Sequence, residues 1–250
     1  ILWTRNIRSR NLKHYLHDST KLMSLITDRY LAYQLSNQNT IDKYILFGLI
    51  EKLYLNTIDA DKFNEIIIKL IESGAFELDL QNEDNLTVLM ICSHENHRYV
   101  NIVDKLLQGG ASVNIKNNNG ENVLLIAANG SSEIVNMLVQ TDIDLNCQND
   151  KNQTALMLAA EYGCNNVANI LIENGANPNL QDNLGQTPLM LISEQGIPHT
   201  IDILIANGAN VNLRDKNGQN AFSYALCSDP DHLYSVVNPL INAGLEFSDE

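Results

Sequence analysis

The sequence predicts an all-α solenoid of stacked antiparallel helix pairs, and two recurring features carry this prediction. The residue that precedes a short apolar run is Thr or Asn in five copies: Thr87, Asn122, Thr154, Thr187 and Asn220. Successive copies lie 35, 32, 33 and 33 residues apart, and a period near 33 is typical of stacked helical repeats. Most copies also close with paired apolar residues and a glycine, as in Leu171-Ile-Glu-Asn-Gly175. Because such repeats contact only their neighbours, we expect stability to come from stacking rather than from one central core.

The third copy shows how each element is expected to form. Thr154 precedes an apolar run, where its hydroxyl can accept from the free amides of a first helical turn. This first helix is expected to end at Tyr162-Gly163. A second helix through residues 167–172 has its apolar residues at helical spacing and ends at Asn174-Gly175, a pair suited to a left-handed cap. Residues 179–186 are rich in Asp, Asn and Gly, which predicts a hairpin turn leading to the next copy.

The same pattern divides the whole chain. We expect repeats at about 80–114, 115–146, 147–179, 180–212 and 213–247, preceded by a diverged repeat at 41–79. Residues 1–40 have helical composition without the repeat pattern, and we interpret them as an N-terminal helical cap over the apolar end of the 41–250 array. Pro239 lies in the last helical segment, where its missing amide should kink or restart the helix.

Residues 41–247 resemble the ankyrin repeat family, because the period, the capping Thr, the small residues and the Gly-Ala closure recur together. Thr187-Pro-Leu-Met-Leu-Ile192 is the nearest copy of the family signature. The resemblance implies a curved stack with projecting β-hairpin fingers that is used for protein binding. The chain departs from the family at the signature His, which is replaced by Met90, Leu125, Met157, Met190 and Ser223. Flexible apolar side chains are expected to fill this gap, which predicts weaker coupling between repeats.

The charge of the chain restricts its partners. The net charge is −14, but residues 1–55 hold eight Lys or Arg and four acidic residues, so they carry +4 and the remainder carries −18. Such an array repels nucleic-acid phosphates within a Debye length, so we expect no nucleic-acid partner and favour a protein with a basic or polar surface. The sequence contains no run of about 18 apolar residues, so we expect no membrane insertion. We expect a monomer.

The four cysteines lie at unrelated places in their repeats and form no CxxC pair, which favours a reducing compartment such as the cytoplasm. Cys164 and His199 are considered as a nucleophile and base, but each is expected in the loop between the helices of its own repeat, without a surrounding oxyanion site. Cys92, His94 and His97 are a zinc cluster by residue type, yet Cys92 aligns with the small buried position of the repeat. The sequence therefore predicts no catalytic residue, no metal and no cofactor.

In the ankyrin family, variable fingertip and first-helix positions contact the partner. Carried over to this sequence, these positions are Asn118, Asn119, Glu121, Asp150, Lys151, Gln153, Glu161, Tyr162, Asn183, Leu184, Gln186, Glu194, Gln195 and Lys216. Tyr162 and Leu184 are the expected anchors, since interface hot spots favour large side chains inside a polar rim.

The predicted function is a non-enzymatic protein-interaction module that binds a protein partner through the concave face and the hairpin fingers that the family resemblance implies. The alternative is the targeting or substrate-recruiting part of a larger enzyme or effector whose catalytic domain lies outside this chain. The Asn-rich, His-poor repeats resemble ankyrin proteins of intracellular bacteria, giant viruses or protists, which favours an effector in a host cytoplasm.

Overall fold

The computed structural model describes residues 68, 71–72, 77–94, 99–227 and 230–246. The chain divides into two compact units, residues 1–77 and 78–250, and the helices named below belong to the second unit. The expected cap at 1–40 and nearly all of the diverged repeat at 41–79 lie outside the described residues.

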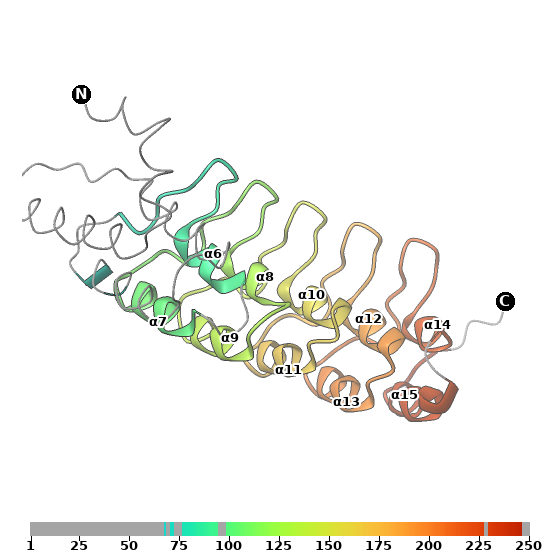
Figure 1. Cartoon of the computed structure of the whole chain (residues 1–250). Helices are drawn as coiled ribbons and strands as arrows, with labels where there is room; N and C mark the ends of the chain where they lie inside the picture. The colour runs from blue at the N-terminus through green and yellow to red at the C-terminus, as the bar shows by residue number, and fades with distance from the viewer. Residues whose placement is uncertain (1–67, 69–70, 73–76, 95–98, 228–229, 247–250) are drawn as a thin grey trace, which may run out of the picture. The chain divides into compact units, whose positions relative to one another are not determined.

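Ten helices in the described part of the second unit form five pairs. They are α6 (Val88–His94) with α7 (Val100–Gln108), α8 (Val123–Ala127) with α9 (Ser132–Leu138), α10 (Ala155–Glu161) with α11 (Asn165–Glu173), α12 (Pro188–Gln195) with α13 (Pro198–Ala206), and α14 (Ala221–Ala225) with α15 (Pro230–Asn242). The first helices of the pairs pack side by side in one row and the second helices pack in another. Long loops, called fingers here, project beside the first row (Figure 1). The predicted all-α solenoid is confirmed.

The first helix of each pair begins at the predicted Thr or Asn. Thr154 and Thr187 each accept a hydrogen bond through Oγ1 from a backbone N–H three residues later, both at 3.3 Å. The Asn122 side chain accepts from two backbone N–H groups, each at 3.1 Å. These side chains satisfy amides that the first helical turn leaves without partners. Each capping residue therefore fixes where a helix starts and where the preceding finger ends.

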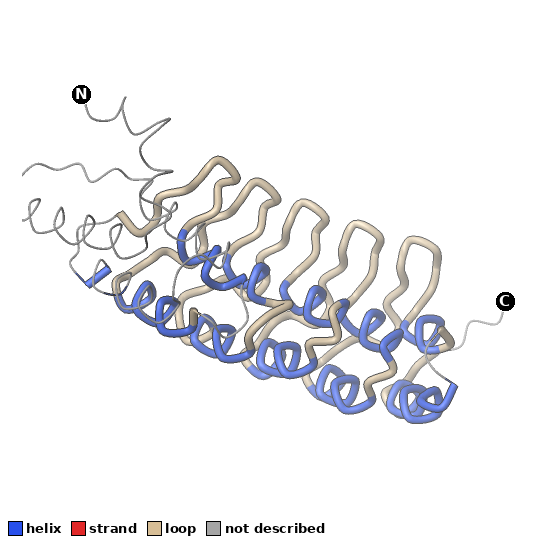
Figure 2. Tube along the Cα trace, in the orientation of Figure 1, coloured by secondary structure: helices blue, strands red, loops and turns tan. Residues whose placement is uncertain are grey.

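Each finger is a hairpin-shaped loop that is organised by its own Asn or Asp. Oδ1 of Asp182 accepts from the N–H groups of Leu184 and Gln186, both at 2.8 Å, and the Asp182 N–H donates to the Gln186 carbonyl at 3.1 Å. The same arrangement is built on Asn82, Asn117, Asn149 and Asp215. Figure 2 shows the fingers as loops, and the described residues contain one isolated bridge, Gln81 with Thr87, rather than strands.

Backbone hydrogen bonds join the tip of each finger to the next. The Lys216 N–H donates to the Leu184 carbonyl, and the Asn183 N–H donates to the Lys151 carbonyl, both at 2.9 Å. The same bond joins Asp150 to Asn119 at 3.0 Å and Asn118 to Asp84 at 3.3 Å. We call this series the tip ladder. It runs from the first described finger to the last.

Side chains form two further ladders. Nε2 of Gln181 donates to the carbonyl of Gly185 in its own finger at 2.6 Å and to that of Arg214 in the next finger at 2.9 Å. The donors at the same position in earlier fingers, which complete this glutamine ladder, are Gln81, Lys116 and Gln148.

The third series, the asparagine ladder, lies where each finger begins. Nδ2 of Asn179 donates to the Gly208 carbonyl at 2.8 Å, and its Oδ1 accepts from the Asn210 N–H at 2.7 Å. The same two-way contact is made by Asn114 and Asn212.

These ladders add directional contacts between repeats to the apolar side chains expected at the position of the family His, of which Met90, Leu125, Met157 and Met190 are buried. Amide side chains and the finger backbones hold neighbouring repeats together through directional bonds. Met90 also takes up a polar contact, because its Sδ accepts from the Thr87 N–H at 3.4 Å. Of the two expectations for Pro239, a kink or a restart of the helix, the restart is wrong, because α15 continues through this residue.

Candidate protein-binding surface

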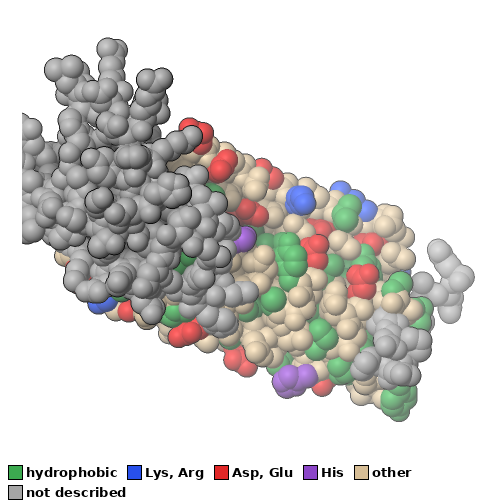
Figure 3. Space-filling view, in the orientation of Figure 1, with side chains coloured by type: hydrophobic (Ala, Val, Ile, Leu, Met, Phe, Trp, Pro, Cys, Tyr) green, Lys and Arg blue, Asp and Glu red, His purple; other side chains and the backbone are tan. Residues whose placement is uncertain are grey.

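The predicted contact residues lie on one surface of the array, which we call the finger face. It consists of the finger tips, the finger bases and the exposed ends of the first-row helices. Acidic side chains are distributed over the side of the array seen in Figure 3, with apolar side chains between them. The fourteen predicted residues fall into three groups that differ in what their side chains do.

The tip group contains two asparagines whose side chains are already used within the protein. Oδ1 of Asn183 accepts from Nδ2 of Asn152 at 2.6 Å, while Nδ2 of Asn183 donates to the Asp150 carbonyl at 3.1 Å. Asn118 makes the same pair of contacts with Asn85 and Glu83. Both side chains therefore hold adjacent fingers together, which leaves them less free to bind a partner.

The other tip residues present their side chains to solvent. Asn119, Asp150, Lys151, Leu184 and Lys216 are all exposed. Leu184 is 60% exposed although it is fully apolar. Its backbone is fixed by the tip ladder on one side and by Asp182 on the other. The result is an apolar side chain held at a defined place in front of the array.

The base group lies where each finger meets its first-row helix, and its side chains are half-buried. Nε2 of Gln153 donates to Oε2 of Glu161 at 3.2 Å, so the finger base orients a carboxylate on α10. Oε2 of Glu121 accepts from Nδ2 of Asn117 at 2.7 Å. The Glu121 and Glu161 side chains are thus held in place by hydrogen bonds where the fingers meet the first-row helices.

Gln186 contacts Tyr224, which is not among the predicted contact residues. Its Nε2 donates to the Tyr224 hydroxyl at 2.9 Å, and this hydroxyl donates to Oδ2 of Asp215 at 3.0 Å. Burial raises the pKa of the Tyr224 phenol, as do the hydrogen bond and charge of Asp215 and the charge of Glu194, while the bond from Gln186 lowers it. Tyr224 therefore stays neutral and connects two fingers. The sequence does mark Tyr224 as unusual, because it lies four residues after the capping residue Asn220, where the other repeats hold Ile or Leu.

The helix group lies at the ends of α10 and α12. Glu161, Glu194 and Gln195 are exposed, and Tyr162 is 58% exposed where it caps the C-terminus of α10. Leu158, one helical turn before Tyr162 on α10, is buried at 8% exposure. Tyr162 is thus a large ring at the edge of an otherwise polar surface.

The cysteines and the histidine that were considered as catalytic or metal-binding residues lie in different surroundings. Cys92 is buried, and desolvation raises the pKa of its thiol to about 12, so it remains uncharged. Cys164 is the N-cap of α11, and burial raises its thiol pKa as well. His199 lies inside α13 rather than in a loop, which corrects the sequence interpretation. A raised thiol pKa lowers the nucleophilic thiolate fraction.

Two searches of the described residues bear on other site types. They contain no group of three or more His, Cys, Asp or Glu side chains placed to hold a metal ion. None of their helices combines the length and apolarity that a membrane span requires. The finger face combines fixed hydrogen-bonding groups, exposed carboxylates and two large exposed side chains, Tyr162 and Leu184.

The comparisons with known proteins agree with the repeat pattern. A family profile described as ankyrin repeats in three copies matches residues 58–149, 97–182 and 156–250. Comparison with curated proteins gives no match.

Proposed function

Because the chain belongs to the ankyrin repeat family, whose repeats are generally protein–protein interaction modules, we propose that the finger face binds a protein partner without catalysing a reaction. Tyr162 and Leu184 anchor the contact, and carboxylates and amides surround them. The observation that carries this proposal is the exposure of these two large side chains, at 58% and 60%, on a surface whose fingers are fixed by ladders. Binding energy is usually concentrated in a few such residues.

The charges of the face specify the surface of the partner. Glu161, Glu194 and Asp150 are exposed, against Lys151 and Lys216 at the tips. Charge complementarity accelerates association and excludes wrong partners more than it raises affinity. The matching surface is basic or polar, with an apolar pocket or ridge to receive the anchors. Binding through such a surface should weaken as salt concentration rises.

The cysteines are consistent with an intracellular setting. Cys92, Cys147, Cys164 and Cys227 are all free, and free thiols persist best in reducing compartments. We therefore assign the module to the cytoplasm. The effector role that the Asn-rich, His-poor repeats suggest stays a prediction.

The test is capture of partners from cell lysate by the immobilised chain, followed by mass spectrometry. We expect the double variant Tyr162→Ala/Leu184→Ala to lose captured proteins that the original chain retains, with unchanged circular dichroism and thermal unfolding. The control is Tyr234→Ala, which removes a ring of 78% exposure from α15, outside the finger face. Equal capture by the double variant and the original chain would refute the assignment of the finger face.

A further inference from the structure

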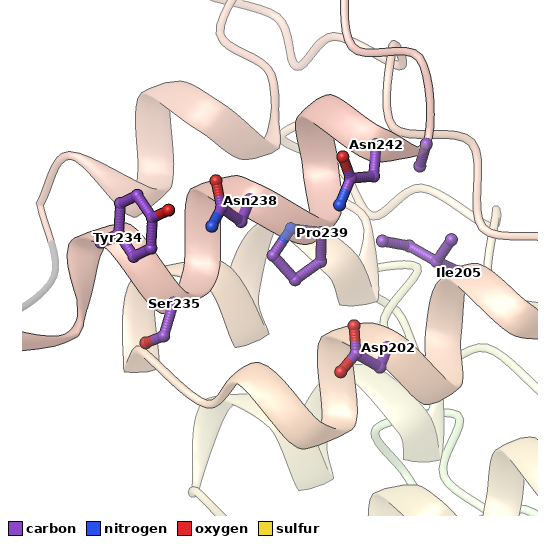
Figure 4. A pocket seen from close by; sticks show the side chains of 8 residues that line it. Asp202, Ile205, Tyr234, Ser235, Asn238, Pro239 and Asn242 are labelled. Atoms are coloured by element: carbon purple, nitrogen blue, oxygen red, sulfur yellow. The ribbon is translucent and has the colours of Figure 1, made fainter.

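A groove lies between α13 and α15, which are second helices of their pairs, so it is outside the finger face (Figure 4). Its volume is about 510 Å³, which is within the range of pockets that hold ligands. Asp202 and Ile205 line it from α13, and Tyr234, Asn238 and Asn242 are among the residues that line it from α15. We call this hollow the outer groove. Both of its walls belong to described helices.

The equivalent positions one repeat earlier are more covered. Ile172 of α11 lies 33 residues before Ile205 and is 1% exposed, whereas Ile205 is half-buried. Asn169 lies 33 residues before Asp202 and is half-buried, whereas Asp202 is exposed. The helix that forms the other wall also differs, because α15 has 13 residues against nine in α13 and contains Pro239. The outer groove is therefore a feature of this helix pair and not of the repeat in general.

Three side chains follow one another along the α15 wall of the groove (Figure 4). Tyr234, Asn238 and Asn242 are spaced four residues apart, which places them on one side of the helix with a rise of about 6 Å per step. Neither asparagine side chain makes a hydrogen bond with another described residue. By contrast, Nδ2 of Asn207 on α13 donates to the Ile203 carbonyl of the same helix at 2.9 Å. The two amides of α15 are thus open to an external group.

The spacing of these two amides matches an extended peptide. An asparagine side chain has an acceptor oxygen and an NH2 donor, so it can pair with both the N–H and the carbonyl of one residue in an extended chain. Every second residue of such a chain presents these groups at the same edge, with a repeat of about 6.6–6.8 Å. The step of about 6 Å from Asn238 to Asn242 is close to this repeat. The two side chains are therefore placed to hold alternate residues of a bound segment.

The remaining lining residues favour one type of side chain in that segment. Ile205, Pro239 and Ala243 are apolar, and Asp202 is the only charged residue that lines the groove. Asp202 is exposed and forms no ion pair with the described residues. An arginine matches both features, because its aliphatic stem packs on apolar groups and its planar guanidinium pairs with a carboxylate through two parallel hydrogen bonds. Lysine has a charge of the same sign but lacks this planar fork.

We propose that the outer groove binds an extended segment of a partner protein that carries an arginine. Asn238 and Asn242 hold the backbone of the segment, and every second side chain points toward the groove. The arginine packs on Ile205 and Pro239 and pairs with Asp202. The net charge of −14 favours the approach of such a basic segment. This site is separate from the finger face, so each of the two assignments can fail without the other.

The test is an NMR titration of the full chain with a blocked seven-residue peptide in which Thr alternates with Ala and Arg is the central residue. The β-branched Thr residues favour the extended form. A second peptide carries citrulline in place of Arg, which keeps the shape of the side chain and removes its charge. The readouts are the backbone amide signals of α13 and α15 and, in the original chain, the side-chain NH2 signals of Asn238 and Asn242.

Three variants separate the contributions to binding. Asn238→Ala/Asn242→Ala removes the two amides that hold the peptide backbone, and Asp202→Asn removes the charge. The matched control is Asn207→Ala, which removes an amide that is bonded within its own helix. The backbone spectra show whether each variant is folded.

We expect the Arg peptide to bind the original chain with a Kd on the order of 1 mM and to shift both side-chain NH2 signals. The citrulline peptide should bind about two- to fivefold more weakly at low salt, and Asp202→Asn should remove this difference. Asn238→Ala/Asn242→Ala should weaken the binding of both peptides at least about tenfold, while Asn207→Ala leaves it unchanged. The proposal is wrong if neither NH2 signal shifts up to about 10 mM Arg peptide. Equal affinities of the two peptides for the original chain, or equal weakening by the control, also contradict it.

Discussion

Removing one asparagine of the asparagine ladder tests whether neighbouring repeats are coupled as the structure indicates. In Asn179→Ala, the Gly208 carbonyl loses its donor at 2.8 Å and the Asn210 N–H loses its acceptor at 2.7 Å. A hydrogen bond contributes about 0.5–1.5 kcal/mol net, and both of these partners lie in exposed residues that water can reach. We therefore expect a loss of about 1–2 kcal/mol in the free energy of unfolding.

The assay is urea unfolding of the full chain, followed by far-ultraviolet circular dichroism. The matched control is Asn174→Ala, which removes one bond at 2.8 Å within a single repeat, from Nδ2 to the Ile170 carbonyl. The control should cost less than about 1 kcal/mol. Because stability in a repeat array depends on coupling between neighbours, only Asn179→Ala should also broaden the transition. If both variants unfold at the same urea concentration with the same slope, the ladder does not couple the repeats.

Three further predictions concern the core, the finger geometry and the Tyr224 network. Leu171→Ala creates a cavity at a side chain of 0% exposure and should cost about 2–5 kcal/mol in urea unfolding. Gly185→Ala places a Cβ 2.9 Å from the backbone of the next finger. Its cost should therefore exceed the roughly 1–2 kcal/mol of a left-handed backbone. The control is Gly218→Ala, where φ is +79° and the added Cβ meets no atom within 4 Å, so this variant measures the backbone cost alone. Equal losses in the free energy of unfolding for the two variants would contradict a clash at Gly185. For Tyr224, a folded-state pKa above the unfolded value of 10.0 means that its stability contribution is complete below that value and lost as pH rises through the folded pKa. Tyr224→Phe should reduce the alkaline loss of stability, measured as the urea midpoint against pH, and an unchanged pH profile would refute this role.

Local features of the fold could be predicted from sequence because they depend on neighbouring residues. Thr154 and Thr187 cap helices through groups three residues away, and Gly175 takes the left-handed conformation expected after Asn174. A capping side chain and the amides that it satisfies belong to one turn of the chain. The period then extends these local signals to the whole array.

The function of individual asparagines could not be predicted in this way. Asn183 and Asn119 both looked like exposed tip residues, yet Asn183 is held by Asn152, 31 residues earlier. Its role depends on which fingers lie side by side and on the direction of each amide, and neither is encoded in a short stretch of sequence. Tyr224 is different, because a Tyr at a position otherwise held by Ile or Leu was visible in the alignment of repeats.

The ladders also influence binding, because an ordered finger loses little conformational freedom when a partner binds. Asn179 lies outside the predicted contact residues, yet its bonds to Gly208 and Asn210 fix the finger that carries Leu184. Asn179→Ala should therefore weaken partner capture together with stability, whereas Tyr162→Ala/Leu184→Ala should weaken capture alone. A variant that loses stability but keeps full capture would show that the fingers are ordered by the partner and not by their neighbours. The two effects separate the anchors that touch the partner from the bonds that hold those anchors in place.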